Sequence, residues 1–364
     1  MNSKLTVAHL RRYAIARSLF APTGLEEAVQ ALGFVQADPI RAPARAQDLT
    51  LRHRVTGYRA GDLERLYPGL AVEEDAFVNY GFLPRAHYAL MHPRVARTRW
   101  GPATARRVQA VLAFVRERGE AHPRDVDAHF AHGAVRNYWG GSSNATTQLL
   151  DGMHYRGMLR VARRDSGIRV YAVREQAGEP LGAAARRERL DALVDVVVRK
   201  YAPLPLASLN PLVRRLRYGA PQWRGGLDSA LTRARKRLAH ARVDGVDWYW
   251  PDGEDPRAIA GAGDDRVRLF APFDPVVWDR GRFELFWNWS YRFEAYTPPA
   301  LRKLGYYALP LLWRDKVIGW ANLSVTGAVL QSSLGFVAGR APRDAAFRRA
   351  LERELDEMQT FLRA

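Results

Sequence analysis

The order of apolar and polar positions in the first part of the chain predicts short helices around one extended segment. Apolar residues recur at a spacing near 3.6 over 5–19, which is typical of an amphipathic helix with arginines on its polar face. A second helix is expected over 25–32, ending at Gly33, because glycine readily takes the left-handed conformation found after many helices. A short strand then leads to Pro39, and a basic helix is expected over 41–56. This succession resembles a winged-helix arrangement.

Two later segments repeat the succession of helices followed by a hairpin. In residues 102–172, three helices precede two strands that are expected to pair across a turn at 165–167. In residues 185–252, the last helix is expected over 228–241 and a short hairpin over 243–250. No residue-level periodicity accompanies these units, so they are an architectural repeat. The other helices expected in the two segments cover 103–118, 124–131, 145–156, 185–201 and 206–216.

The pattern changes to strand-like apolar runs separated by turn residues after residue 266. We interpret this region as a small antiparallel β-barrel or curled sheet, followed by an amphipathic helix over 341–364. The predicted fold class is therefore α+β. The expected strands cover 267–273, 306–313, 317–322 and 328–337. The expected domains are 1–100 (first winged helix, extended segment and linker), 101–180 (second winged helix), 181–254 (third winged helix) and 255–364 (barrel and closing helix).

The composition is that of a globular protein rather than a disordered or membrane-spanning one. The chain has 364 residues, of which 47% are hydrophobic and 26% charged, and no apolar run reaches the roughly 18 residues needed to cross a bilayer. The absence of cysteine excludes disulfides, thiolate nucleophiles and cysteine-ligated metals. The N-terminal residues lack the apolar core and small-residue cleavage site of a secretory signal, so we expect a cytoplasmic protein.

The excess of basic residues is the strongest global signal. Fifty-six lysines and arginines against thirty-eight aspartates and glutamates give a net charge of +18. Such a field attracts polyanions, and arginine suits phosphate recognition and stacking on bases. A genome rich in G and C also raises the arginine content, but it should raise the aspartate and glutamate content as well. Such a bias therefore explains why arginine is used rather than lysine better than it explains the excess of positive charge. Nucleic acid is therefore the favoured partner.

Gln36 and Asp38 are the candidate catalytic pair because they stand two residues apart in an otherwise apolar segment. In an extended chain this spacing puts both side chains on one face, about 7 Å apart along the backbone. A carboxylate and an amide on a rigid apolar support could hold one water molecule. The alternative is that the pair merely ends a surface strand, since a Gln-x-Asp triplet arises by chance about once in a chain of this length.

Other catalytic arrangements are missing from the sequence. No phosphate-binding glycine loop or serine nucleophile motif is present, and the glycines at 261–263 lack the strand and helix of a dinucleotide site. The closest histidine pair, His129 and His132, does not have the spacing of a zinc-binding helix. Residues 291–307 instead interleave basic and aromatic side chains around a double proline, a combination that can stack on bases or insert into a groove. The alternative for these tyrosines is a barrel core with a polar rim.

Three motifs occur in this order along the chain: Leu-Gly-Phe-Val-Gln-Ala-Asp-Pro-Ile at 32–40, Pro-Phe-Asp-Pro-Val-Val-Trp-Asp-Arg at 272–280, and Tyr-Arg-Phe-Glu-Ala-Tyr-Thr-Pro continuing to Arg-Lys-Leu-Gly-Tyr-Tyr-Ala-Leu-Pro within 291–310. Together they resemble the winged-helix DNA glycosylase family, which includes enzymes that unhook azinomycin and nitrogen-mustard crosslinks. The resemblance implies three tandem winged helices and a C-terminal β-barrel that together form a concave DNA-binding surface. Where members of the family often have Arg-Ala-His-His, this chain has Arg-Ala-Gln-Asp at 45–48.

The resemblance also implies that Gln36 and Asp38 are catalytic, in the Gln-x-Asp form of the bacterial branch that acts broadly on alkylated DNA. The implied reaction is hydrolysis of the N-glycosidic bond of alkylated purines, in N7-alkylguanine monoadducts and interstrand crosslinks, as part of base excision repair. Asp38 would stabilise the developing sugar cation and accept a proton from a water that Gln36 orients. We expect a monofunctional, monomeric enzyme without metal or redox cofactor that acts on double-stranded DNA in the nucleoid and not at a membrane.

Basic and aromatic residues in three parts of the chain are the expected DNA contacts. They lie after the Gln-x-Asp segment, in the second winged helix, and in the loop before the last strands. The competing interpretations are a DNA-binding regulator, in which Asp38 only ends a strand, and an RNA-binding module, for which the chain lacks a ribonucleoprotein aromatic motif. The expected DNA-binding residues are Arg41, Arg45, Arg52, Arg54, Arg156, Arg160, Arg163, Arg292, Tyr296, Arg302 and Lys303.

Overall fold

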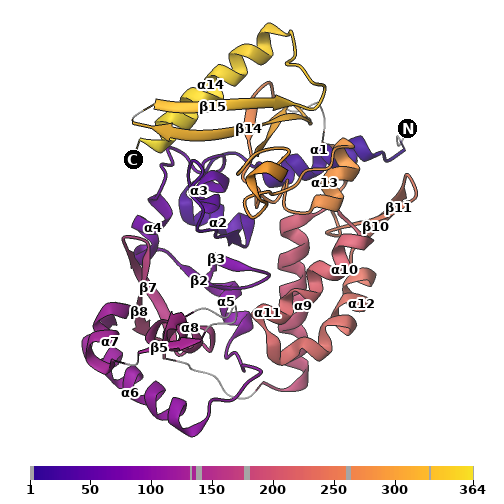
Figure 1. Ribbon diagram of the computed structural model, residues 1–364. Helices are drawn as coiled ribbons and strands as arrows, with labels where there is room; N and C mark the ends of the chain where they lie inside the picture. The colour runs from indigo at the N-terminus through magenta and orange to yellow at the C-terminus, as the bar shows by residue number, and fades with distance from the viewer. Residues whose placement is uncertain are drawn as a thin grey trace. The chain divides into compact units, whose positions relative to one another are not determined.

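The computed structural model describes residues 4–131, 133–136, 142–175, 181–259, 264–327 and 329–363. His132 and the glycines at 261–263 lie outside the described residues. Contacts within the chain divide it into two compact units, and Figure 1 labels many of their elements. Unit 1 comprises 1–62, 195–213 and 231–364, and unit 2 comprises 63–194 and 214–230. The four-domain division expected from the sequence stays a prediction.

Unit 1 begins with two short helices and the extended segment that carries the candidate pair. Helix α1 (Val7–Ser18) is followed by α2 (Leu25–Leu32), which ends at Gly33. The φ angle of this glycine is 68°, the left-handed conformation that a glycine adopts without steric cost. Both predicted helices are therefore confirmed, and strand β1 (Val35–Gln36) follows them directly.

The basic helix expected over 41–56 is much shorter than the sequence pattern suggests. Only α3 (Ala46–Leu51) is helical there. Pro39 and Pro43 have no backbone N–H and disfavour the helical conformation in the residues before them, so the chain up to Arg45 stays irregular. The residues of α3 are buried rather than presented to solvent.

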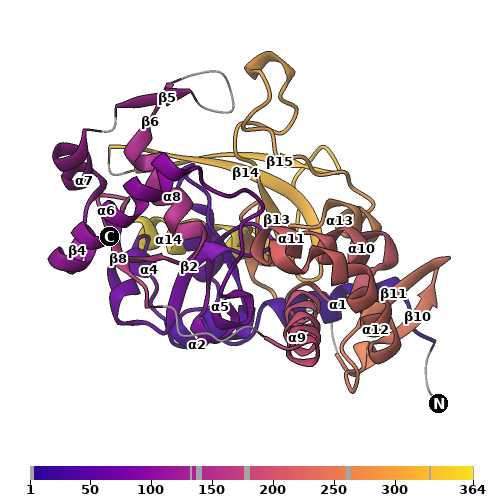
Figure 2. The same cartoon turned by 90° about the horizontal axis from the view of Figure 1, so that it is seen from below.

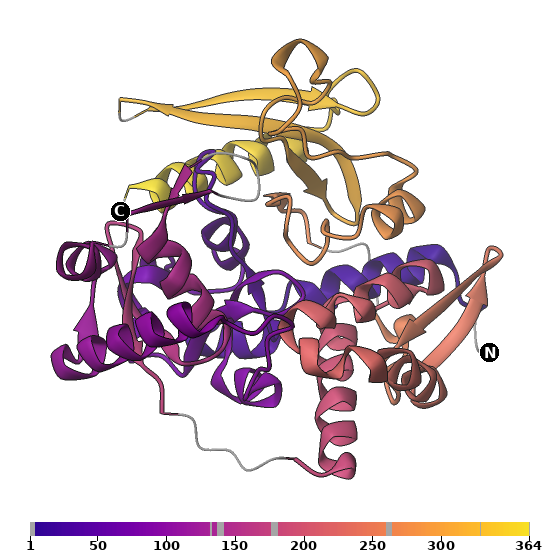
Figure 3. The same ribbon diagram turned by 60° about the horizontal axis from the view of Figure 1, so that its bottom comes forward.

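The C-terminal part of unit 1 is a four-stranded antiparallel sheet. Strands β12 (Val267–Leu269), β13 (Leu309–Trp313), β14 (Lys316–Thr326) and β15 (Val329–Phe336) follow one another across it in chain order. Helix α14 (Ala345–Leu362) packs against β12 and β15 and runs along the sheet (Figure 3). Within the described residues no ladder joins β12 to β15, so the sheet is open and the expected closure into a barrel is not confirmed.

A cluster of buried side chains joins the N-terminal helix to this sheet. It includes Ile15 of α1, Phe283 of α13 (Arg280–Trp287), and Leu312 and Val317 of the sheet. Burial of apolar surface contributes about 25 cal/mol per Å², so such a cluster stabilises the contact between the helix and the sheet. The cluster also contains Phe270, Val276, Val277, Tyr291 and Ala308, so the segment before α13 is fixed in the interior of unit 1.

A second sheet in unit 1 is formed by a hairpin and one short strand. Strands β10 (Ala239–Val243) and β11 (Val246–Trp250) pair with each other, and β11 also pairs with β9 (Leu204–Pro205). The expected hairpin is confirmed, but its first strand begins earlier than predicted. Because the backbone of β10 pairs with β11, helix α12 (Leu227–Arg237) is shorter than the expected 228–241.

Unit 2 contains three helices followed by a hairpin, as the sequence predicts. Strands β7 (Leu159–Asp165) and β8 (Ile168–Val173) form the hairpin, and β4 (Glu120–Ala121) pairs with β8. A further hairpin, not anticipated, joins β5 (Ala134–Arg136) to β6 (Ser142–Asn144). The helices are α6 (Pro102–Arg118), α7 (Pro123–Phe130) and α8 (Ala145–Tyr155).

The segment expected to be a linker is folded in unit 2. Strands β2 (Val72–Ala76) and β3 (Tyr80–Pro84) pair in antiparallel fashion, although β2 contains the acidic residues at 73–75. The sequence pattern did not predict this strand because consecutive carboxylates suggest an exposed segment. In the structure these three carboxylates are buried and paired with arginines. The neighbouring elements are α4 (Asp62–Leu66), η1 (Tyr67–Gly69) and α5 (Arg85–Met91).

Among the described residues, one order of elements occurs three times along the chain: a helix, a short strand, further helices and a hairpin. It runs from α2 to β3, from α6 to β8, and from α9 (Ala183–Tyr201) to β11. The third run also contains α10 (Leu206–Arg214), α11 (Leu216–Gly219) and η2 (Pro221–Gly226). In the part of the chain that the structure describes, no helix is long and apolar enough to span a membrane.

Candidate active site

Gln36 is held at the end of β1 by a contact from a distant part of unit 1. Phe34 and Val35 are fully buried before it, and Gln36 itself is buried. The indole N–H of Trp278 donates to Gln36 Oε1 at 2.8 Å. Because an indole nitrogen can only donate, this contact directs the amide oxygen toward Trp278 and leaves Nε2 as a donor for another partner.

Asp38 is held on the same strand end by a local turn. Its Oδ1 accepts the backbone N–H of Ile40 at 2.9 Å, and its own backbone N–H donates to Gln47 Oε1 at 3.2 Å. Oδ2 has no hydrogen-bond partner among the described residues. Burial raises the pKa of the Asp38 carboxyl, and the Ile40 N–H opposes this shift. A carboxylate of raised pKa accepts a proton more readily than an exposed aspartate does.

Asp274 organises the loop that presents Trp278. Its backbone carbonyl accepts the N–H groups of Val277 and Trp278, and its carboxylate accepts the N–H of Val276 at 2.9 Å. Both carboxylate oxygens also accept from Arg54, at 2.8 and 3.1 Å, and the two side chains are fully buried. Such a bidentate pair fixes the loop, because removal of either partner leaves an uncompensated charge in the interior.

Two arginines expected to contact DNA are instead paired inside unit 1. Besides binding Asp274, the buried guanidinium of Arg54 donates to two backbone carbonyls. Arg52 makes a bidentate pair with Glu354, and these side chains are 4% and 2% exposed. Each guanidinium is therefore held in a buried ion pair, and the assignment of Arg52 and Arg54 to DNA contacts stays a prediction. Their carboxylate partners stand 220 and 302 residues away along the chain, so no local pattern could reveal them.

A buried lysine that the sequence analysis did not single out lies behind the candidate pair. Lys200 Nζ donates to the backbone oxygen of Phe34, just before β1. Burial lowers the pKa of Lys200 to about 7, with help from the charge of Arg54, while Asp274 opposes the shift. The signal in the sequence is a lysine close behind the apolar run 196–198, near the end of a helix.

Tyr307 is a second unanticipated member of the site. Its ring is buried, and its hydroxyl has no hydrogen-bond partner among the described residues. Burial raises the pKa of this hydroxyl, and the Asp38 carboxylate makes the largest contribution of any charge to the same shift. Tyr307 therefore lies within electrostatic reach of Asp38. The sequence pattern singled out this segment for contacts with bases, whereas Tyr307 faces the interior.

The remaining predicted DNA contacts stay predictions, and the structure gives their surroundings in each unit. In unit 1, Arg41, Arg292, Tyr296 and Lys303 are exposed, and Arg45 and Arg302 are half-buried. In unit 2, Arg160 is half-buried, Arg163 pairs with Glu120 at 3.0 Å, and the guanidinium carbon of Arg156 lies 3.8 Å from the ring centroid of Trp100. Four of the unit 1 residues, from Arg292 to Lys303, belong to one loop.

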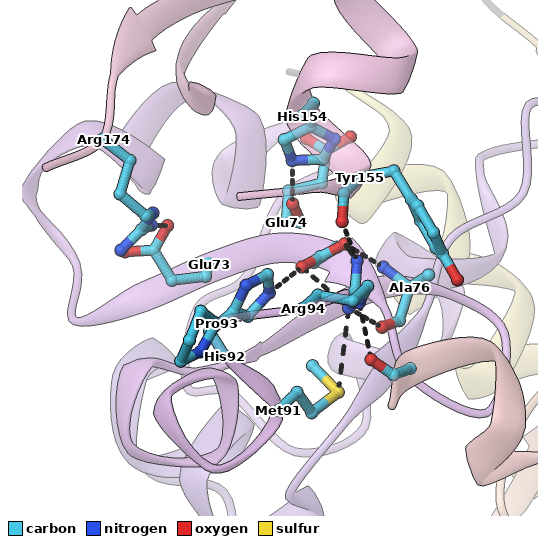
Figure 4. A network of polar contacts seen from close by, with 12 residues as sticks. Glu73, Glu74, Ala76, Met91, His92, Pro93, Arg94, His154, Tyr155 and Arg174 are labelled. Carbon is cyan, nitrogen blue, oxygen red and sulfur yellow. Dashed lines mark hydrogen bonds and ion pairs between the residues drawn. The ribbon is translucent and has the colours of Figure 1, made fainter. Parts of the chain in front are cut away.

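Unit 2 has a buried polar network of its own, shown in Figure 4. The Asp75 carboxylate accepts from Arg94 at 2.9 and 3.1 Å, and His92 Nε2 lies 2.9 Å from the same carboxylate. Burial lowers the pKa of His92 to about 4, so its ring is neutral near pH 7. Burial opposes ionisation of Asp75, but Arg94 and His92 hold the pKa of this carboxyl below its ordinary value. The Asp75 carboxylate is thus paired within the protein, and the network braces the β2–β3 hairpin.

A pocket of about 350 Å³ adjoins this network in unit 2. Among the residues that line it, Arg169 pairs with Asp151 at 2.9 Å and the hydroxyl of Tyr80 donates to Glu74. The charged groups of the pocket are therefore matched within the protein. No group of three or more histidine, aspartate or glutamate side chains among the described residues is arranged to hold a metal ion.

Comparisons with known proteins identify the family. The fold is similar to that of the Streptomyces sahachiroi DNA glycosylase AlkZ, with a TM-score of 0.60 and 14% sequence identity over 99% of this chain and 97% of that chain. At this identity the likeness concerns the fold alone. Residues 29–361 match the family described as DNA glycosylase AlkZ-like. The chain is therefore a member of the AlkZ-like DNA glycosylase family, as the resemblance of its motifs predicted.

Proposed function

We propose that this protein is a DNA-repair glycosylase that hydrolyses the N-glycosidic bond of alkylated purines, with N7-alkylguanine as the main lesion. Membership of the family implies glycosylase activity. The observation that carries the finer assignment is the buried pair at the end of β1, in which Asp38 has a raised pKa and Gln36 has an oriented amide. Interstrand crosslinks formed through N7 of guanine present the same bond and belong to the same substrate class.

The chemistry of the lesion decides what the protein must supply. An N7-alkylated guanine is already positively charged, so it leaves without a strong general acid. As the bond from N9 to C1′ breaks, its electron pair neutralises the base and positive charge develops on the sugar. The Asp38 carboxylate stabilises that charge, and its effect is larger in a buried site than in water because the local dielectric is lower.

A water molecule is the nucleophile in this proposal. Gln36 Nε2 donates to the water oxygen, since Gln36 Oε1 already accepts from Trp278. Asp38 Oδ2 takes a proton from the water while the oxygen bonds to C1′, which yields an abasic sugar and the free base. Tyr307 keeps its proton because burial and Asp38 both raise its pKa, so its hydroxyl stays a neutral donor within electrostatic reach of the carboxylate.

DNA binding is assigned to the basic surface. The recurring order of helix, strand, helices and hairpin supports three winged-helix subdomains over 1–100, 101–180 and 181–254, ahead of a sheet domain over 255–364. We expect a monomer whose concave surface holds duplex DNA, and the net charge of +18 supports phosphate contacts. The arginines, lysine and tyrosine assigned to these contacts are Arg41, Arg45, Arg156, Arg160, Arg163, Arg292, Tyr296, Arg302 and Lys303.

Single-turnover release of 7-methylguanine from methylated duplex DNA tests the proposal. We expect Asp38→Asn and Gln36→Ala to slow release by about 10²- to 10⁴-fold, the usual contribution of a positioned acid–base group, while DNA affinity is retained. Asp264→Asn removes an exposed carboxylate of the same unit and is the matched control, with unchanged release. Normal release by both site variants would contradict the assignment.

The pH dependence of the same assay gives a second readout. Only ionised Asp38 accepts a proton, so the rate falls toward acid pH, with a midpoint above the ordinary aspartate pKa of 3.8 because burial raises this pKa. Asp38→Asn should remove this acid limb from the residual activity. Binding of methylated duplex without any base release by the unaltered protein would favour a DNA-binding regulator instead.

A further inference from the structure

The loop between α13 and β13 exposes large apolar side chains. Tyr296 is 80% exposed, Leu301 67% and Tyr306 45%. The 292–306 loop extends away from the four-stranded sheet in Figure 2. Large apolar groups gathered on one exposed segment mark a surface that binds a partner, because leaving them in water is unfavourable.

Hydrogen bonds hold the 292–306 loop in one shape while its apolar side chains face solvent. The buried carboxylate of Glu294 accepts the backbone N–H groups of Lys303 and Leu304, at 2.8 and 2.7 Å. Arg302 Nε donates to the carbonyl of Thr297 at 2.8 Å, and the two prolines that follow this threonine restrict the backbone further. A loop ordered in advance loses little conformational entropy when it binds.

The charges of the loop favour a polyanion. Arg292 and Lys303 are exposed, and the guanidinium carbon of Arg302 lies 5.0 Å from the ring centroid of Tyr306. The carboxylate of the loop, on Glu294, is buried and bound to backbone. Exposed apolar groups flanked by cations are complementary to a groove of DNA. The cations can meet the phosphates along its edges, and the apolar groups can meet the stacked base pairs between them.

The loop leads directly into the candidate active site. Tyr307, the residue that follows it, is the buried phenol whose pKa is raised by burial and by the Asp38 charge. Its ring meets that of Phe293, at the other end of the loop, edge to face at 5.3 Å between centroids. The two ends of the loop therefore pack against each other within electrostatic reach of Asp38.

We propose that Tyr296 and Leu301 form a wedge that enters the base stack next to the damaged nucleotide, while Arg292 and Lys303 bind the flanking phosphates. This inference rests on the proposed glycosylase function. Apolar side chains that insert between base pairs unstack the step and bend the duplex. The unstacked step exposes the sugar of the lesion to Asp38 and to water, and the wedge replaces the stacking that the lesion loses.

Fluorescence of 2-aminopurine placed beside 7-methylguanine in a duplex reports insertion, because this base becomes brighter when it unstacks. The parent is Asp38→Asn, and the comparison protein also carries Tyr296→Ala and Leu301→Ala. We expect the parent to raise the fluorescence on binding and the triple variant not to do so. With Asp38 intact, Tyr296→Ala/Leu301→Ala should slow base release from a paired duplex by about 10- to 100-fold, as expected for loss of a stacked aromatic group. A mismatch at the lesion, which weakens stacking in advance, should restore most of that rate.

Matched controls separate the wedge from a general loss of apolar surface. Leu285→Ala and Tyr218→Ala alter exposed side chains outside the loop and should preserve both the fluorescence rise and the rate. Equal fluorescence for the parent and the triple variant overturns the wedge, whatever the rate of base release. Absence of base release by the unaltered protein overturns the glycosylase proposal instead, and the fluorescence comparison then decides the wedge independently.

Discussion

The contact between Trp278 and Gln36 allows a direct test of how the candidate catalytic amide is oriented. In Trp278→Phe the ring remains aromatic, but the indole N–H that donates to Gln36 Oε1 at 2.8 Å is lost. The amide of Gln36 is then buried with an unpaired oxygen, and it can turn about its last bond so that oxygen and nitrogen exchange places. In the turned state the water meets an acceptor where it needs a donor.

The magnitude follows from the burial of this contact. A buried acceptor without a partner costs about 1–3 kcal/mol. If the free energy that favours the productive orientation of the amide falls by about 1–3 kcal/mol, the barrier to base release rises by the same amount. The single-turnover rate then slows by about 5- to 150-fold. The free energy of unfolding should fall by no more than the same amount, about 1–3 kcal/mol, so the protein stays folded.

The assay is single-turnover release of 7-methylguanine with enzyme in excess, accompanied by DNA binding and urea unfolding. Trp313→Phe is the matched control, because its buried indole N–H has no hydrogen-bond partner among the described residues, and its rate should stay unchanged. If Trp278 acts through the amide, Trp278→Phe has no further effect in a Gln36→Ala background. Equal slowing by Trp278→Phe in both backgrounds would refute the reasoning.

Two further predictions concern the buried charges behind β1. Because burial lowers the pKa of Lys200 to about 7 and an unfolded lysine titrates near 10.5, the unfolded chain binds more protons between these values. The free energy of unfolding, measured by urea titration relative to that of Lys200→Met, should therefore rise from about pH 7 to about pH 10.5. Exposed Lys316→Met is the control. A difference between the unaltered protein and Lys200→Met that stays constant with pH would contradict the lowered pKa. Asp274→Asn leaves Arg54 buried without its charge partner, so it should lower the free energy of unfolding by about 3–5 kcal/mol. The exposed pair of Asp264 predicts a loss of at most about 1 kcal/mol for Asp264→Asn. Equal losses for the two variants would contradict this account.

Local patterns in the sequence determined much of the secondary structure and the centre of the candidate site. Helices α1 and α2 agree with the apolar spacing because that spacing is set by one turn of the helix itself. Gly33 marks the end of α2 for an equally local reason, the left-handed φ that follows the helix. Gln36 and Asp38 could be singled out because two residues in an extended segment share a face whatever surrounds them.

Only the tertiary structure decided how that pair is supported. Trp278 stands 242 residues from Gln36, and Lys200 stands 166 residues from Phe34, so no periodicity links them. The sequence likewise gives the charge of an arginine but not its burial, because burial depends on whether folding brings a carboxylate to it. Arg54 has such a partner in Asp274 and lies in the interior. The openness of the C-terminal sheet has the same origin, since closure depends on which edge strands meet and not on the strands' own residues.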